Sequence, residues 1–354
     1  MDEREAAVGG HGLGFTPFET RAELILAVAG EADRLGFARV SVAEAMGHAA
    51  PVLLAEVAQH TRRVELATAV LPVWSRSPAV LAMTAAGLQR LSRGRFVLGL
   101  GAGTPPLIEG LHGIGWEDPF GKLRTVLVAV RQLLEGHRMP SAVDGSRPLR
   151  LFVGPESPVP IALASMSPAG IRLAGELADR WLPFLWPRSQ LDVGRRLVEE
   201  GAVAAGREQL PEVCPAVPLA TGRDRAAAEA VAARWLTVYC TQMGPIYPRM
   251  LRERFGYAAE VDALLAANAD RDEPVLPDAA RRLAQDVLLV ATHDELGDAT
   301  AGWTQAGADR LDLVLPFGLD EAELLTAVRA AAPSRPAADL QPPTRSGSAT
   351  VPPT

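Results

Sequence analysis

Residues 61–101, TRRVELATAVLPVWSRSPAVLAMTAAGLQRLSRGRFVLGLG, contain one complete strand–helix–strand unit. Residues 64–71 (VELATAVL) are a short apolar run that predicts a buried strand. Residues 78–91 begin with proline and predict a helix, and residues 95–100 (RFVLGL) predict the next strand. Two buried strands joined through a helix favour parallel pairing, because a parallel pair needs a long crossover connection.

The same alternation continues on both sides of this unit. Further strands are predicted at residues 12–15, 37–42, 160–164, 180–184, 212–220 and 310–316. Helices are predicted at residues 21–35, 51–60, 120–134, 169–177, 188–205, 225–239, 294–306 and 320–331. Alternating strands and helices predict an α/β fold, either an open doubly wound sheet or a closed barrel. About eight such units favour the (β/α)₈ TIM barrel.

Two segments depart from this rhythm. Residues 240–285 break the alternation, and we interpret them as a mostly helical insertion. Residues 332–354 are rich in Pro, Ser, Thr and Ala and have little apolar surface to bury, so we expect a disordered C-terminal tail. The predicted organisation is therefore a single barrel domain over residues 1–331, followed by that tail.

Composition and charge exclude several classes of protein. The formal net charge is −7 and the sequence has no basic stripe, which argues against a nucleic-acid partner. We give no functional weight to Lys122 being the only lysine. No apolar run is long enough for a membrane span, and residues 1–10 lack the apolar core of a signal peptide, so we expect a cytoplasmic protein. The six histidines and two cysteines show no metal-ligand spacing, and we expect no metal site.

Titratable side chains follow the predicted strands at the end where a barrel builds its active site. Glu44 and His48 follow the second strand, and Glu109 lies beyond the fourth. A histidine there can transfer protons near neutral pH, and a half-buried glutamate can act as acid, base or ring-orienting acceptor. The alternatives are a loop histidine making one hydrogen bond, and a glutamate paired with Arg76 or Arg124.

A glycine-containing loop, GAGTPP at residues 101–106, follows the fourth strand. It lacks the third glycine of a dinucleotide fingerprint, because Pro105 and Pro106 stand in its place. Gly101 and Gly103 would let the backbone approach a flat ring or a phosphate, or they simply form a tight turn. The spacing alone leaves both interpretations open.

A short polar segment, Ser165-Met166-Ser167-Pro168, precedes the helix after the fifth strand. Free amides at a helix N-terminus form an anion site, which would suit a cofactor phosphate. Ser167 as a helix cap with Pro168 in the first turn is the structural alternative.

Several blocks of sequence together carry a family resemblance. They are Leu35-Gly36-Phe37, TRRVEL at residues 61–66, LSRGRFVLGLG at 91–101, GTPP at 103–106 and IEGLHG at 108–113. The chain resembles the luciferase-like monooxygenase superfamily over roughly residues 12–330. Within that superfamily it is most similar to the branch of coenzyme F420-dependent reductases that resemble methylenetetrahydromethanopterin reductase.

The resemblance implies a (β/α)₈ barrel that holds reduced F420, or alternatively FMN, in its mouth. It also implies a non-proline cis peptide at Val70–Leu71 that faces the cofactor ring. The positions that match cofactor contacts are Val70, Leu71, Gly101, Gly103, Thr104, Ser165, Met166 and Ser167. One departure is Ala45, where luciferases carry a histidine, and His48 is a nearby substitute.

The implied activity is an oxidoreductase in which reduced F420 transfers hydride to a C=C or C=N bond of a small organic or peptide-derived substrate. Glu109, His48 and Glu44 are the candidate catalytic residues, and Glu109 or His48 would handle the accompanying proton. A two-component monooxygenase using reduced FMN is the first alternative, although Ala45 counts against it. A non-catalytic flavin-binding barrel is the second. Family members are often dimers, so a homodimer is a further expectation.

Overall fold

The computed structural model describes residues 10–139, 144–145 and 147–333. Its strands are all parallel and form one curved sheet. Its members are β1 (Gly12–Phe15), β2 (Arg39–Val42), β3 (Glu65–Thr68), β5 (Phe96–Gly101), β6 (Ile161–Ala164), β7 (Arg180–Trp181), β8 (Glu212–Val213), β9 (Ala216–Gly222) and β11 (Asp312–Val314). β7 pairs with β8, and the chain continues from β8 directly into β9. β9 pairs with β11, and β11 pairs with β1. The ring closes in this way, and the predicted (β/α)₈ TIM barrel is confirmed.

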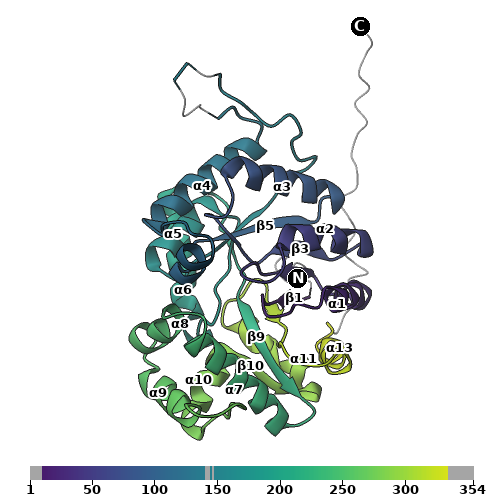
Figure 1. Ribbon diagram of the computed structural model, residues 1–354, viewed down its shortest axis with the longest axis vertical. Helices are drawn as coiled ribbons and strands as arrows, with labels where there is room; N and C mark the ends of the chain where they lie inside the picture. Colours follow the sequence, from purple (N-terminus) through teal and green to yellow (C-terminus); the bar gives the residue numbers. More distant parts are fainter. Residues whose placement is uncertain (1–9, 140–143, 146, 334–354) are drawn as a thin grey trace.

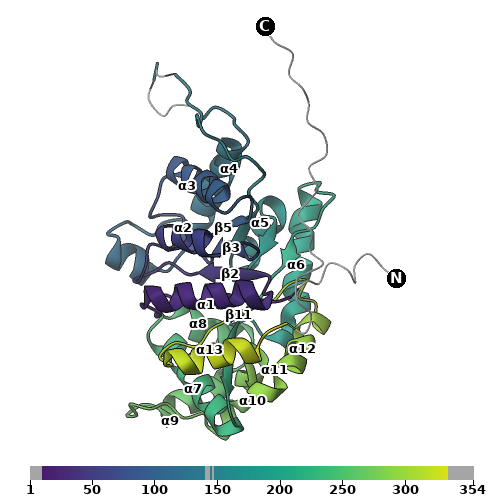
Figure 2. The same cartoon turned by 90° about the vertical axis from the view of Figure 1, so that its right-hand side faces the viewer.

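Helices cover the outside of the sheet (Figures 1 and 2). The helices that follow strands of the ring are α1 (Ala22–Leu35), α2 (Ala50–His60), α3 (Pro78–Leu91), α4 (Pro119–Leu134), α5 (Pro168–Leu177), α6 (Leu191–Ala204), α7 (Arg225–Thr241) and α13 (Glu321–Ala330). Several begin at a side-chain cap. Ser77 caps α3, Asp224 caps α7, and Asp320 forms a capping box with Glu323 at the start of α13.

The structure corrects the predicted strands and helices in five places. The strand expected at residues 64–71 is divided into β3 and β4 (Leu71–Pro72), and the strand expected at 212–220 is divided into β8 and β9 around Pro215, which has no N–H to donate. A strand that the sequence did not predict, β10 (Leu289–Thr292), pairs with the end of β9. The helix predicted at residues 188–205 begins with a short 3-10 turn, η2 (Arg188–Gln190), before α6. The helix predicted at residues 294–306 is replaced by three short elements, η5 (His293–Glu295), α11 (Leu296–Ala299) and α12 (Ala301–Gln305).

The segment at residues 240–285 packs against α7 on the outside of the barrel (Figure 1). It contains α8 (Ile246–Arg249), the π-helical turn η3 (Met250–Arg254), α9 (Ala258–Ala267), η4 (Asp278–Ala280) and most of α10 (Arg281–Val287). No helix among the described residues is long and apolar enough to cross a membrane. Of the tail expected at residues 332–354, positions 334–354 lie outside the described residues.

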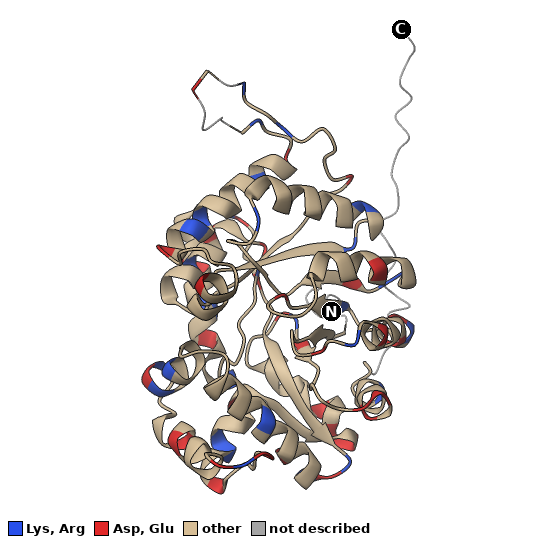
Figure 3. Ribbon diagram, in the orientation of Figure 1, with Lys and Arg blue, Asp and Glu red and all other residues tan. Residues whose placement is uncertain are grey.

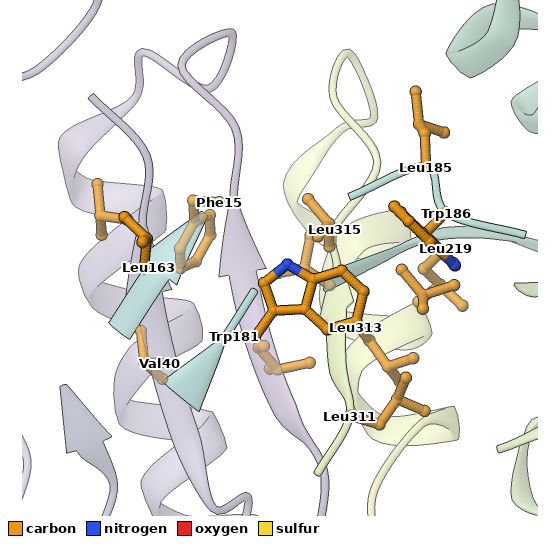
Figure 4. Packing of buried hydrophobic residues seen from close by; sticks show 14 of the residues in the cluster. Phe15, Val40, Leu163, Trp181, Leu185, Trp186, Leu219, Leu311, Leu313 and Leu315 are labelled. Atoms are coloured by element: carbon orange, nitrogen blue, oxygen red, sulfur yellow. The ribbon is translucent and has the colours of Figure 1, made fainter. Parts of the chain in front are cut away.

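Large apolar side chains fill the space between the sheet and its helices. Figure 4 shows Trp181 and Trp186 among buried leucines, and their ring centroids lie 5.1 Å apart in an edge-to-face arrangement. Trp181 is on the outer face of β7, because a Cβ on Gly194 of α6 would lie only 2.1 Å from its ring. Its neighbours on β7 therefore point into the barrel, since side chains alternate along a strand.

The end of the barrel interior at which the strands begin is filled by charged side chains. Six of them form a chain of ion pairs in the order Asp312, Arg39, Glu65, Arg180, Glu212 and Arg310. The N···O distances run from 2.6 to 3.0 Å. A Cβ on Gly12 would lie 2.2 Å from a carboxylate oxygen of Asp312, so glycine is needed beside the pair. On the outer helices, charges of both signs are mixed (Figure 3).

Candidate active site

The floor of the barrel mouth, where the strands end, is made of small side chains. Ala67, Val97, Ala162, Leu182 and Cys214 form a separate buried cluster inside the barrel. The next layer toward the mouth, Val70 and Ala164, packs on this cluster but is only partly buried. Because no bulky side chain covers these two residues completely, a flat ligand has a surface on which to lie.

The two loop glycines make room for protein side chains rather than for an open slot. A Cβ on Gly101 would lie 2.7 Å from a methyl group of Val70 and 3.8 Å from the Cβ of Ala164. Gly103 has a positive φ of 70°, and a Cβ there would lie 3.0 Å from two carbons of Ile108. Gly103 therefore forms a tight turn, as one of the two interpretations held. The absence of a side chain at Gly101 leaves space for the side chain of Val70.

Two predictions for the residues after β3 are corrected. The cis peptide bond joins Ala69 and Val70, one bond earlier than the expected Val70–Leu71. Leu71 is completely buried in β4 and packs in the main hydrophobic core, so it presents no surface to a ligand. Thr104 is partly exposed beside the mouth, and its carbonyl accepts a hydrogen bond of 2.9 Å from the amide of Ile108.

The loop after β5 is held by two tryptophans. The indole N–H groups of Trp74 and Trp116 donate to the carbonyl of Ala102, over 2.8 and 3.1 Å. Glu109 is exposed in the π-helical turn η1 (Pro106–Leu111), and its Oε1 accepts from the amide of Trp116 over 3.2 Å. Glu109 thus contacts the backbone of Trp116, the residue whose indole holds this loop.

Glu44 and His48 lie in the loop between β2 and α2 but in different surroundings. Both carboxylate oxygens of Glu44 accept from the guanidinium of Arg76, and one also accepts from the amide of Ala50 over 2.9 Å. The pair with Arg76, one of the alternatives considered for Glu44, is therefore present. The Nε2 atom of His48 is enclosed and has no hydrogen-bond partner among the described residues. A buried polar atom without a partner is unusual in a folded protein.

The segment Ser165–Ser167 ends β6 and begins α5. The hydroxyl of Ser167 accepts from the amide of Gly170 over 3.1 Å, so it caps the helix as the structural alternative proposed. The indole of Trp181 donates to the carbonyl of Ser165 over 2.8 Å, and Arg254 donates to the carbonyl of Met166. These bonds fix the segment beside the helix N-terminus.

Sequence reasoning missed an aromatic wall on the side of the mouth opposite the small residues. The wall consists of Phe18, Phe184, Tyr239, Tyr247 and Phe317, which come from the loops after β1, β7 and β11, from the end of α7 and from α8. The five residues lay in segments that were interpreted only as strand, helix, loop or insertion, and nothing in their spacing marks them as neighbours. The insertion also reaches the opposite side of the mouth, since a Cβ on Gly244 would lie 3.5 Å from the ring of Pro106.

The loop after β7 brings part of this wall into place. Leu185 adopts a left-handed backbone conformation with φ of 49°, which is rare for a leucine. On one side of it Phe184 contacts the wall, and on the other side Trp186 packs edge-to-face on Phe255. The guanidinium of Arg254 stacks over Trp186 at 4.5 Å from the ring centroid.

Comparison with known proteins agrees with this architecture. The family model for luciferase-like monooxygenases matches residues 8–310. The chain belongs to this family. Membership makes it an oxidoreductase, as the sequence resemblance implied. A Mycobacterium tuberculosis protein, provisionally named a coenzyme F420-dependent oxidoreductase, is 30% identical over 320 residues, covering 83% of this chain and 90% of the relative.

Solved structures show the same fold at lower identity. The F420-dependent tetrahydromethanopterin reductase of Methanopyrus kandleri superposes with a TM-score of 0.70 at 18% identity, covering 92% of this chain and 99% of the other. The oxygenating constituent of 3,6-diketocamphane monooxygenase of Pseudomonas putida, solved with FMN, has a TM-score of 0.64 at 19% identity, covering 92% and 97%. Both cofactor types thus occur on this barrel.

Proposed function

We propose that this chain uses reduced coenzyme F420 to transfer hydride to a C=C or C=N bond of a small organic or peptide-derived substrate. The observation that carries the proposal is the partly buried floor of Val70 and Ala164, which lies beside the N-terminus of α5. The F420-dependent name of the relative that covers most of the chain supports F420 over FMN.

The residues at the mouth fit the chemistry of this cofactor. The flat deazaflavin ring would rest on Val70 and Ala164, which present apolar surface. The phosphate of the cofactor would lie at the start of α5, near Ser165 and Ser167. Pro168 has no N–H and the amide of Gly170 is taken by Ser167, so the amide of Ala169 is the donor that the helix N-terminus offers. When bound, reduced F420 supplies a hydride.

The protein's own groups would manage the proton and exclude water. The enclosed Nε2 of His48 is suited to hold or move a proton, because no protein group among the described residues competes for it. The Glu44–Arg76 pair fixes the loop that carries His48. Glu109 remains a proposed catalytic residue. Its side chain is exposed, so it can exchange protons with water.

The choice of cofactor is tested by titrating the purified protein with F420 and, separately, with FMN, and following the quenching of tryptophan fluorescence. We expect saturable quenching by F420 and none by FMN at the same concentrations, because the relative that supports the assignment is F420-dependent. Binding of FMN alone would replace this proposal with the two-component monooxygenase. Quenching by neither compound would leave a barrel without a redox cofactor and overturn the proposal.

A further inference from the structure

The aromatic wall is a continuous surface of five rings, Phe18, Phe184, Tyr239, Tyr247 and Phe317. Tyr239 lies at its centre, with ring centroids 4.9 Å from Phe184, 5.2 Å from Tyr247 and 6.3 Å from Phe18. Phe18 and Phe317 extend the wall with their centroids 5.0 Å apart. All except Tyr239 are only partly buried, so the wall presents ring surface to the mouth.

Two hydroxyl groups interrupt this apolar surface. The chain has three tyrosines, and Tyr257 donates its hydroxyl to Asp286. The hydroxyls of Tyr239 and Tyr247 form no hydrogen bond within the described part of the chain, yet neither is among the fully enclosed unpartnered atoms found there. Tyr239 is 4% exposed and Tyr247 is partly buried. A polar group that is nearly buried and lacks a protein partner is available to a ligand.

The two hydroxyls are suited to donate hydrogen bonds. Burial raises the pKa of Tyr247 to about 12 and the pKa of Tyr239 well above its ordinary value, and the neighbouring Tyr247 adds to the rise at Tyr239. Both phenols therefore remain protonated at neutral pH. Arg254, a cation of the insertion, already donates to the carbonyl of Met166 and stacks over Trp186.

We propose that the aromatic wall is the substrate side of the mouth and that the hydroxyls of Tyr239 and Tyr247 hold the carbonyl oxygen of an apolar α,β-unsaturated ketone or aldehyde. This inference rests on the proposed function and names its substrate class. A C=C bond accepts hydride when it is conjugated to a carbonyl, because the oxygen takes the displaced electron pair. Two O–H donors aimed at that oxygen stabilise the charge that develops.

The step balances as follows. The hydride bonds to the β-carbon of the enone, the C=C π electrons form the enolate, and the negative charge moves to the oxygen held by Tyr239 and Tyr247. The α-carbon then takes a proton, and the product is the saturated carbonyl compound. Oxidation of reduced F420 by loss of one hydride would also release one proton. This proton balances the one that the α-carbon takes up.

The inference is tested without cofactor, using 4-dimethylaminochalcone, a fluorescent aryl enone, and 4-dimethylaminostilbene, which has similar rings but no carbonyl. We expect the protein to bind the chalcone more tightly than the stilbene. In the double variant Tyr239→Phe/Tyr247→Phe, chalcone affinity should fall about thirtyfold while stilbene affinity is unchanged, since two hydrogen bonds of about 1 kcal/mol each are lost. The red shift that hydrogen bonding gives to chalcone emission should also disappear.

Three controls make the result decisive. Tyr257→Phe removes the tyrosine hydroxyl that is already paired and should leave chalcone affinity unchanged. Both single variants are measured together with the double variant, and thermal unfolding checks that each is folded. Equal chalcone affinity in the wild type and the folded double variant would overturn the inference.

A separate F420 titration distinguishes this inference from the proposed function. If F420 binds but the carbonyl makes no difference, only the substrate assignment fails. If the carbonyl preference is present and F420 does not bind, the cofactor assignment fails while the enone site stands. We expect F420 affinity to be the same in the wild type and the tyrosine variants, because the cofactor lies on the opposite side of the mouth.

Discussion

The two ends of this barrel differ in how completely their side chains are buried and their polar groups are paired. At the end where the strands begin, Arg39 and Asp312 are almost completely buried, and their charges are satisfied by each other and by neighbours. At the end where the strands finish, Val70 and Ala164 remain partly exposed, and the Nε2 of His48 has no partner within the described residues. The closed end stabilises the barrel, and the open end leaves its surface to a ligand.

The comparison shows how to separate structural from functional polar residues in such a barrel. Polar atoms whose partners are complete, such as those of Glu65, belong to stability. Polar atoms that are nearly buried and still unpaired, such as the hydroxyl of Tyr239, are the ones that we propose for binding. Glu44 illustrates the risk of judging by position alone, because it lies at the open end but is paired with Arg76.

The largest expected effect is at the closed end. Arg39→Met should lower the free energy of unfolding by about 3–5 kcal/mol, because it leaves the carboxylates of Asp312 and Glu65 without their shared partner. Urea unfolding followed by circular dichroism measures this change. Arg249→Met, which breaks the exposed pair with Glu253, is the matched control and should produce no measurable change. Equal behaviour of the two variants would remove the contrast between buried and exposed pairs.

The next effect concerns acid stability. Although burial opposes ionisation of Glu65, Arg39 and Arg180 lower its pKa from 4.5 to about 2. The stabilisation from this group is therefore complete above about pH 4.5 and is lost as the pH falls toward 2, and the shift corresponds to about 3 kcal/mol. The difference in unfolding free energy between the wild type and Glu65→Gln should be largest at neutral pH and shrink toward pH 2.5. A difference that does not depend on pH would contradict the assignment.

The smallest effect tests the open end. Ala164→Leu should weaken F420 binding at least tenfold, because the added side chain covers the floor on which the ring is proposed to lie. The free energy of unfolding should change by less than about 1 kcal/mol, since Ala164 is only partly buried. Fluorescence titration and urea unfolding measure the two quantities. Ala55→Leu, at a partly buried site on α2, is the control and should leave F420 affinity intact. Undiminished affinity in Ala164→Leu would move the cofactor elsewhere.

Prediction from the sequence succeeded where the signal is local. The helix over residues 78–91 and the strand over residues 12–15 were predicted with their observed bounds, because apolar periodicity and a proline or glycine at the ends mark such elements. It failed for β10, which has only four residues and lies between helical segments. It also left the role of Gly103 open between a ligand contact and a tight turn, because what a glycine makes room for depends on a side chain that only the folded loop brings near it.

By itself, the sequence determined the alternation of strands and helices, the barrel and the family, because these depend on short-range patterning repeated along the chain. Only the tertiary structure decided which charges neutralise one another and which rings form one wall. Arg39 and Asp312 are 273 positions apart, and Tyr239 meets Phe18 only after the ring of strands has closed. No local pattern encodes such contacts, because closure of the sheet creates the neighbourhood in which they occur.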